Sequence, residues 1–202
     1  AMSYKCALAG VNAGGGKAVL IGDPAVLKSR DLLHAYGRML NRIGSSFATG
    51  EDVGMSVADV EIMREVSPYV GGTASAGAGD PSVHTAKGVF AGLRAVLATR
   101  FGTADFAGIR IAVQGLGNVG WRLCERLHQA GAVLTVADID RDRVERAVAR
   151  FGATAIPTDA VHAAAVDIFA PCALGGVVNA ATIGEIRARA VAGAANNQLA
   201  AP

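Results

Sequence analysis

The chain has 202 residues, of which 51% are hydrophobic and 18% are charged, and it carries a formal net charge of +2 at pH 7. Together with 26 glycines, this composition is typical of a folded α/β protein and excludes a disordered one. The sequence contains no basic run with interleaved aromatic residues, no apolar run of membrane-spanning length and no secretory signal pattern. We therefore expect a cytoplasmic protein with no nucleic-acid or membrane partner.

The first part of the chain, residues 1–79, begins with a glycine-rich loop and continues into a helix. The loop Gly14-Gly-Gly-Lys17 is followed by the apolar run 18–21, which predicts a strand. A helix is expected over residues 29–42, because apolar residues recur on one of its faces and Ser29 is a suitable N-cap.

A second helix is expected to begin at Ser56, where Asp59 completes a pattern similar to a capping box. Before this helix, residues 46–49 predict a short β-type segment. After it, the small residues of 71–79 predict an interdomain segment. We therefore place a domain boundary after residue 79.

The second part of the chain, residues 80–202, begins with a helix expected over 83–100 and then alternates between strands and helices. This alternation predicts a Rossmann-type doubly wound parallel sheet with right-handed crossovers. The expected elements are strands 109–114, 133–138, 166–170 and 190–194 and helices 118–130 and 141–150.

The turn after the strand at 109–114 carries the motif Gly115-x-Gly117-x-x-Gly120. An amphipathic helix follows, and the next strand ends in Asp138, eighteen residues after Gly120. This order of strand, glycine turn, helix, strand and acid is expected of a dinucleotide-binding unit. The glycines allow a tight turn and let backbone N–H groups approach a pyrophosphate at the helix N-terminus.

Asp138 is then expected to accept hydrogen bonds from the hydroxyls of the adenosine ribose. Because a carboxylate at this position repels a 2′-phosphate, the sequence favours NAD over NADP as the cofactor. Arg141 and Arg143 follow closely, and we expect them to weaken that preference.

Two lysines and one carboxylate are candidates for catalysis in the first part. Lys17 follows three glycines, so no bulky side chain shields its amine, and Lys5 lies in a similarly apolar stretch. A lysine in apolar surroundings loses its proton more readily, which suits a general base near neutral pH. Asp52 closes a short β-type segment. A phosphate-binding P-loop is excluded, since Val11 and Ala18 replace its required glycine and hydroxyl residue.

Six segments occur in a characteristic order: Tyr4-Lys5, Gly14-Gly-Gly-Lys17, Glu51-Asp52-Val-Gly54, Gly115-x-Gly-Asn-Val-Gly120, Ala170-Pro-Cys-Ala-Leu-Gly175 and Gly193-Ala-Ala-Asn-Asn-Gln-Leu199. In this order and spacing they resemble the leucine, valine and phenylalanine dehydrogenases of the glutamate dehydrogenase superfamily. The resemblance covers essentially the whole chain. It implies NAD-dependent oxidative deamination of an apolar L-amino acid to a 2-oxo acid and ammonia, carried out by a homo-oligomer.

The resemblance also implies roles for domains and single residues. Residues 1–79 correspond to a partial α/β substrate-binding and catalytic domain, and residues 80–202 correspond to the NAD-binding domain. Lys17 matches the catalytic lysine that activates water, and Asp52 matches the carboxylate that exchanges protons with the substrate amino group. The implied substrate contacts are Lys5, Gly50 and Asn197. The implied cofactor contacts are Thr85, Gly115, Gly117, Asn118, Val119, Gly120, Asp138, Ala170, Cys172 and Asn196.

The chain also departs from the family's pattern. The family's chains extend further at both ends, so we expect the nucleotide-binding sheet to be incomplete at its C-terminal end. Pro81-Ser-Val-His-Thr85 stands where the family has Pro-x-Pro-Val-Thr. Gly50 is typical of phenylalanine-type enzymes, whereas Glu51-Asp52-Val-Gly54 is closer to the leucine type. A leucine- or valine-type substrate is therefore expected, with phenylalanine-type specificity as the alternative.

Two further functions remain open at the level of sequence. One is a non-catalytic nucleotide-binding fragment of such an enzyme, and the other is an NAD-dependent reductase of another class. The absence of a Tyr-x-x-x-Lys pair counts against the short-chain type of reductase. Cys6, Cys124 and Cys172 form no C-x-x-C pattern, so buried free thiols are expected. No cluster of histidine, cysteine and carboxylate residues has metal-ligand spacing, so no metal site is expected.

Overall fold

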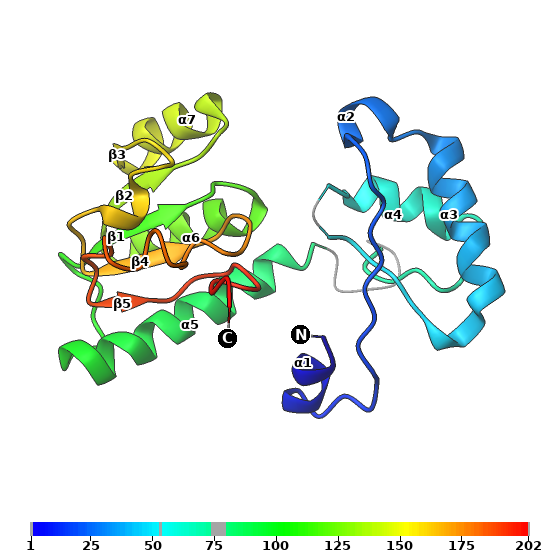
Figure 1. The fold of residues 1–202 in the computed structure, drawn as a ribbon, viewed down its shortest axis with the longest axis horizontal. Helices are drawn as coiled ribbons and strands as arrows, with labels where there is room; N and C mark the ends of the chain where they lie inside the picture. The colour runs from blue at the N-terminus through cyan, green and yellow to red at the C-terminus, as the bar shows by residue number, and fades with distance from the viewer. Residues whose placement is uncertain (1, 53, 74–79, 202) are drawn as a thin grey trace. The chain divides into compact units, whose positions relative to one another are not determined.

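The structure of the chain is a computed structural model that describes residues 2–52, 54–73 and 80–201. The chain forms two compact units, Ala1–Pro81 (unit 1) and Ser82–Pro202 (unit 2) (Figure 1). Residues 74–79 of the predicted interdomain segment lie outside the described residues.

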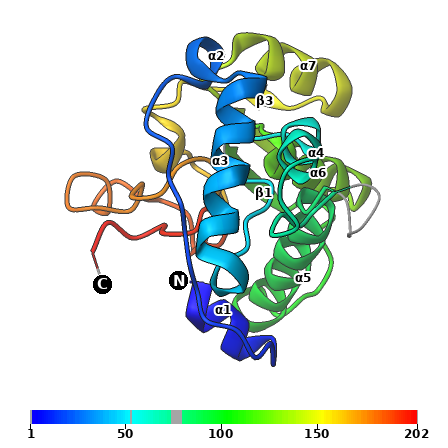
Figure 2. The same ribbon diagram turned by 90° about the vertical axis from the view of Figure 1, so that its right-hand side faces the viewer.

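Unit 1 is built around a pair of helices, α3 (Arg30–Ile43) and α4 (Val57–Arg64), which pack against each other (Figures 1 and 2). A side chain at Gly37 would lie 3.0 Å from the carbonyl oxygen of Met63, so the glycine allows this close packing. The short helices α1 (Met2–Leu8), α2 (Pro24–Leu27) and η1 (Gly44–Ser46) complete the described elements of the unit. The buried core consists of Leu33, Tyr36, Leu40, Val60, Met63 and Val70.

Both long helices of unit 1 begin as the sequence predicts. The hydroxyl oxygen of Ser29 accepts a hydrogen bond from the Leu32 N–H at 3.2 Å, and Ser56 and Asp59 form a complete capping box. Asp59 also pairs with the ammonium group of Lys28 at 2.8 Å. Burial opposes ionisation of Asp59, but the hydrogen bonds from Lys28 and Ser56 outweigh it and lower the pKa of the carboxyl group.

Of the two β-type segments expected in unit 1, the strand at 18–21 is wrong and the segment at 46–49 is reduced to one bridge. Residues 18–21 form no strand, and Val19 and Ile21 are 78% and 96% exposed. Residues 46–49 contain the end of η1 and a single parallel bridge between Thr49 and Val70. An apolar run becomes a strand only where a partner satisfies its backbone groups, and among the described residues the segment 18–21 has no such partner.

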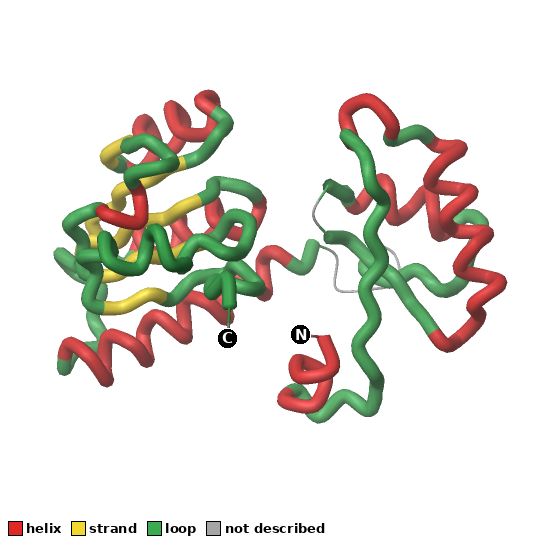
Figure 3. Tube along the Cα trace, viewed as in Figure 1, coloured by secondary structure: helices red, strands yellow, loops and turns green. Residues whose placement is uncertain are grey.

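Unit 2 is a parallel sheet with helices packed on it, as Figure 3 shows. Its described strands are β1 (Arg110–Gln114), β2 (Val133–Ala137), β3 (Thr154–Ala155), β4 (Ile168–Pro171) and β5 (Ala190–Val191). They are all parallel and lie in the order β3-β2-β1-β4-β5. This order, which grows outward from β1 in both directions, is that of a Rossmann-type doubly wound sheet, so the predicted fold class is confirmed.

Side chains of β1 point alternately into two cores. Ile111 and Val113 contribute to the larger core, which also contains residues of the helices α5 (Ser82–Phe101), α6 (Asn118–Gln129) and α7 (Arg141–Phe151). Ala112 faces the smaller core on the other side of the sheet, beside the short helix η2 (Val161–Ala163). The strand is therefore buried on both faces, which explains why its sequence is apolar without alternation.

The sequence predicts the helices α5, α6 and α7 and the strands β1 and β2 to within one or two residues. The strands β4 and β5 are shorter than expected. Strand β3 was not expected at all, because Thr154 and Ala155 are exposed at the edge of the sheet and carry no apolar pattern.

The ion pair between Arg110 and Asp167 links the beginnings of two neighbouring strands, β1 and β4. The Arg110 backbone N–H and its guanidinium group both donate to the carboxylate, with N···O distances of 2.9 to 3.1 Å. The hydrogen bonds from Arg110 hold the pKa of Asp167 below its usual range. A carboxyl group with a lowered pKa stabilises the fold above its unfolded-state pKa of about 3.9, and this contribution is lost as the pH falls through the folded-state pKa.

We therefore expect Asp167→Asn to lower the midpoint of thermal unfolding at pH 7. The difference from the parent protein should shrink as the pH falls below about 4, since both side chains are then uncharged. Circular dichroism melts between pH 3 and pH 7 measure this, with the exposed Asp159→Asn as the control. A difference that is independent of pH would contradict the role given to the ion pair.

Candidate functional site: the carboxyl edge of the unit 2 sheet

The glycine turn between β1 and α6 is the best-defined feature of the candidate site. Gly115 has a φ of +93°, and a Cβ there would lie 2.8 Å from the backbone nitrogen of Ala173. Gly117 is the N-cap of α6, and a Cβ on Gly120 would overlap the carbonyl oxygen of Gly115. Gly115 and Gly120 thus sit where a larger residue would strain or displace the turn, whereas a Cβ on Gly117 would meet only the Arg143 Nη1, at 3.8 Å.

The carboxylate of Asp138, just after β2, is fixed against this turn. Its Oδ2 accepts a hydrogen bond from the Leu116 N–H at 2.5 Å, and its Oδ1 accepts one from the Asp140 N–H at 2.8 Å. A carboxylate has about four lone-pair sites, so both oxygens retain capacity for ligand hydroxyl groups. The position matches that of an acid that recognises a ribose.

The loops after β4 and β5 reach the same edge of the sheet. The Cys172 N–H donates to the carbonyl oxygen of Gln114 at 2.7 Å, and the Ala195 N–H donates to that of Pro171 at 2.9 Å. Further along, the Gly176 N–H donates to the carbonyl oxygen of Asn197 at 2.6 Å. The carboxyl ends of β1, β4 and β5 therefore meet at the point where the strand order reverses, which is where doubly wound sheets bind ligands.

The remaining predicted cofactor contacts differ in their exposure. Ala170 is buried within β4, Val119 is half-buried, and Asn118 and Asn196 are exposed. Thr85 is exposed in the first turn of α5.

The three cysteines are free thiols, as predicted, but of the three only Cys124 is buried, and Cys6 and Cys172 are half-buried. Cys124 is buried in the larger core, and burial raises the pKa of its thiol. Burial of the thiol group also raises the pKa of Cys172, to about 11. At neutral pH the Cys172 thiol is therefore protonated, which suits packing beside a ligand rather than nucleophilic attack.

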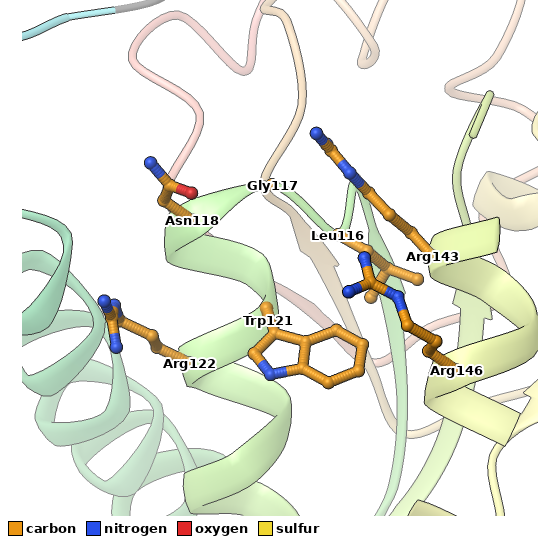
Figure 4. Close-up of a pocket in the computed structure, with 7 residues that line it drawn as sticks. All are labelled: Leu116, Gly117, Asn118, Trp121, Arg122, Arg143 and Arg146. Carbon is orange, nitrogen blue, oxygen red and sulfur yellow. The ribbon is translucent and has the colours of Figure 1, made fainter. Parts of the chain in front are cut away.

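A cavity of about 260 Å³ opens beside the glycine turn, between α6 and α7 (Figure 4). Arg143 and Arg146 project into it from α7, and Trp121 faces them from α6, whereas the guanidinium group of the lining residue Arg122 points to the other side of α6. Leu116, Gly117 and Asn118 of the turn complete the lining. Sequence reasoning included Arg143 but missed the cavity, although the spacing of Arg143 and Arg146 already placed them on one face of a helix.

In unit 1, the structure brings the two predicted catalytic residues together. The ammonium group of Lys17 forms an ion pair with the carboxylate of Asp52. Their side chains are 55% and 44% exposed, so the apolar setting expected for Lys17 is not found. Lys5 is exposed and lies in α1.

The segment that leads to Asp52 is tied to the strand-like residues after α4. The Gly71 N–H donates to the carbonyl oxygen of Thr49 at 2.8 Å, and a Cβ at Gly50 would lie 3.2 Å from the carbonyl oxygen of Gly71. Next to Asp52, Glu51 has a buried Oε2 with no hydrogen-bond partner among the described residues. Burial raises the pKa of Glu51, and the negative charge of Asp80 adds to the effect.

Two kinds of feature are absent from the described residues. Within the ranges 2–52, 54–73 and 80–201, no group of three or more histidine, cysteine or carboxylate residues is arranged to hold a metal ion. No helix in these ranges is both long and apolar enough to cross a bilayer.

The overlap at Gly120 leads to a prediction about the glycine turn. We expect Gly120→Ala to lower the free energy of unfolding by about 2 kcal/mol or more and to abolish dinucleotide binding, because the new methyl group displaces the turn. Gly92→Ala on α5 is a matched control, since a Cβ there meets no atom within 4 Å. The control should be neutral or stabilising, by up to about 1 kcal/mol. Chemical denaturation and NAD titration measure both effects, and an unaffected Gly120→Ala would contradict the geometry.

Two family models match the chain, each over about a third of its length. The model described as "Glu/Leu/Phe/Val dehydrogenase, dimerisation domain" matches residues 1–69, and that described as "Glutamate/Leucine/Phenylalanine/Valine dehydrogenase" matches residues 77–142.

Individual relatives agree with these matches. Leucine dehydrogenase of Bacillus subtilis (strain 168) is 46% identical over 98% of this chain and 55% of its own length. Phenylalanine dehydrogenase of Bacillus thermotolerans is 45% identical over 98% of this chain and 54% of its own length. The crystal structure of L-tryptophan dehydrogenase from Nostoc punctiforme superimposes with a TM-score of 0.73 and 42% identity, over 98% of this chain and 56% of that one.

The chain thus spans about half the length of the curated relatives it matches. The two family models, the relatives and the doubly wound sheet with its glycine turn all lead to the same assignment. The chain belongs to the Glu/Leu/Phe/Val dehydrogenase family.

Proposed function

We propose that the protein catalyses the NAD-dependent oxidative deamination of an apolar L-amino acid to its 2-oxo acid and ammonia. The observation that carries the proposal is the hydrogen bond between the Asp138 carboxylate and the Leu116 N–H in the glycine turn. It fixes a ribose-recognising acid beside a turn that is shaped for a pyrophosphate. We assign unit 2 to the nucleotide and unit 1 to the amino acid.

The residues of unit 2 fit a dinucleotide. Any side chain at Gly115 or Gly120 would fill space at the turn, so the backbone is open to close approach by a phosphate. Helix α6 is twelve residues long and begins at Asn118. Its N-terminus favours the negative charge of a pyrophosphate. When bound, the nicotinamide ring accepts the hydride that leaves the substrate Cα.

Asp138 supports NAD as the preferred cofactor. Its carboxylate hydrogen-bonds with two ribose hydroxyls in NAD, whereas a 2′-phosphate in NADP brings a second negative charge against it. The other cofactor contacts that we assign are Thr85, Asn118, Val119, Ala170, Cys172 and Asn196.

In unit 1, the ion pair between Lys17 and Asp52 supports a division of proton transfers. We assign to Asp52 the exchange of protons with the substrate amino group, since a carboxylate also stabilises the cationic imine that forms there. Lys17 activates the water that attacks the imino carbon, and Lys5 binds the substrate carboxylate as a point charge. Asn197 contacts the substrate from the loop after β5.

An apolar side chain is proposed for the substrate because the relatives are leucine, phenylalanine and tryptophan dehydrogenases. Gly50 is proposed to border the side-chain pocket. We also propose that the protein forms a homo-oligomer, since the model that matches residues 1–69 is described as a dimerisation domain.

The proposal predicts NADH formation at alkaline pH with at least one of leucine, valine and phenylalanine and not with glutamate. Lys17→Ala should lower kcat by about 100-fold or more, because a general base commonly contributes that much, while the Kd for NAD is unchanged. The exposed Arg38→Ala in α3 controls for the loss of a cation in the same unit. Full turnover by Lys17→Ala would disprove the mechanism. Binding of NAD without turnover of any amino acid would leave a nucleotide-binding protein that is not an enzyme.

Gly50→Ala tests the assignment of the pocket. The added methyl group lies 3.2 Å from the Gly71 carbonyl oxygen, so the segment must shift by a few tenths of an ångström and the pocket becomes smaller. We expect the ratio of kcat/KM for phenylalanine to that for leucine to fall by about tenfold, the scale of a one-methylene difference. Gly88→Ala on α5 is the control, because a Cβ there meets no atom within 4 Å. An unchanged ratio would remove Gly50 from the pocket.

A further inference from the structure

We propose that Lys28 is a positioning residue for Asp52. It holds the loop that follows Asp52 in place and thereby keeps the Asp52 carboxylate within reach of Lys17. The inference rests on the proposed function, in which Lys17 and Asp52 transfer the protons of the reaction. The role of Lys28 is exerted through this loop and not through contact with the substrate.

The side chain of Lys28 connects two other segments of unit 1. Its ammonium group donates to the carbonyl oxygen of Gly54 at 3.0 Å and to the carboxylate of Asp59 at 2.8 Å. Gly54 lies two residues after Asp52, and Asp59 lies in the first turn of α4. One ammonium group therefore ties the loop 54–56 to the helix that follows it.

The Asp59 end of this connection is fixed. Asp59 Oδ2 also accepts hydrogen bonds from the backbone N–H and the hydroxyl group of Ser56, both at 2.8 Å. The side chains of Lys28 and Asp59 are only 30% and 12% exposed. A charge-assisted hydrogen bond to a carboxylate that is itself held in a capping box leaves the ammonium group little freedom to move.

The Gly54 end lies in a turn that includes Asp52. Gly54 has a φ of +80°, which residues with a side chain rarely adopt, and a Cβ there would lie 3.9 Å from the Cγ of Pro24 in α2. The Met55 N–H donates to the carbonyl oxygen of Asp52 at 2.9 Å. A displacement of Gly54 therefore also displaces the backbone of Asp52.

Lys28 lies on the same segment as Lys17, eleven residues further along the chain, with α2 between them. This segment meets the one that carries Asp52 at two places. The first contact is the ion pair of Lys17 with Asp52, whose side chains are 55% and 44% exposed. The second is the hydrogen bond from Lys28 to Gly54. Because an exposed ion pair contributes little by itself, the second contact maintains the distance between the assigned acid and base.

The test measures amide hydrogen exchange at Met55 and steady-state kinetics in Lys28→Met and Lys28→Arg. Lys28→Met keeps most of the apolar stem and removes the ammonium group. We expect exchange at Met55 to become about tenfold faster and kcat to fall by about tenfold, as for loss of a charge-assisted hydrogen bond. The Kd for NAD should not change, since NAD is assigned to unit 2. Lys28→Arg should restore both quantities to within about threefold, because a guanidinium group has an N–H for each oxygen.

Asp59→Asn separates positioning from a purely structural role. It removes the ion pair but leaves an oxygen that accepts a hydrogen bond from Lys28. We expect it to lower the midpoint of thermal unfolding while exchange at Met55 and kcat stay within about twofold of the parent protein. Arg38→Met, which removes an exposed cation from α3 in the same unit, is the control for the loss of charge.

The outcomes separate the two proposals. If Lys28→Met leaves exchange at Met55 unchanged, or lowers kcat no more than Asp59→Asn does, the inference is wrong and the proposed function stands. If the parent protein turns over no amino acid, the proposed function is wrong, and exchange at Met55 still decides whether Lys28 holds the loop. Lys28→Met leaves the Asp59 carboxylate without its cation, so circular dichroism must show that the variant is folded. If it is not, the double variant Lys28→Met/Asp59→Asn takes its place.

Discussion

The short hydrogen bond from the Leu116 N–H to the Asp138 carboxylate connects the features on which the candidate site depends. It joins the end of β2 to the glycine turn that follows β1, and the parallel pairing of β1 with β2 brings the two segments to the same edge of the sheet. The turn requires both Gly115 and Gly120. A Cβ on Gly115 would lie against Ala173, and a Cβ on Gly120 would overlap the carbonyl oxygen of Gly115. We propose that the sheet, the turn and the acid together form one preorganised surface for a dinucleotide.

Unit 1 is held together differently. Its core is the contact between α3 and α4, and its candidate catalytic pair lies on connecting segments rather than on these helices. Lys17 follows the glycine loop, and Asp52 follows the single bridge between Thr49 and Val70. Catalytic side chains on loops supported by a packed scaffold are common, because loops can change without loss of the core.

The sequence was most informative where local signals and tertiary structure agree. The N-caps at Ser29 and Ser56 define the starts of α3 and α4 through hydrogen bonds to residues three positions further along the chain. The motif at 115–120 is followed by Asp138 at the spacing expected of a dinucleotide-binding unit. It was misleading at 18–21, where an apolar run lacks a strand partner among the described residues. The sequence did not predict the cavity at Arg143 and Arg146, because the approach of α6 to α7 depends on packing between the two helices and their neighbours.

The chemistry of the site follows from charge and backbone geometry. We propose that the turn offers N–H groups to a pyrophosphate and that Asp138 offers carboxylate oxygens to a ribose. The chain belongs to the Glu/Leu/Phe/Val dehydrogenase family, and we propose that Lys17 and Asp52 transfer protons to and from the substrate.

Hydrogen–deuterium exchange with and without saturating NAD tests the central claim most directly, namely that the glycine turn with Asp138 holds the dinucleotide. Bound NAD should slow exchange at the amides of residues 115–120 and 138–143, while the amides of α3 in unit 1 keep their exchange rates. Exchange at the glycine turn that is unchanged by saturating NAD would contradict the claim.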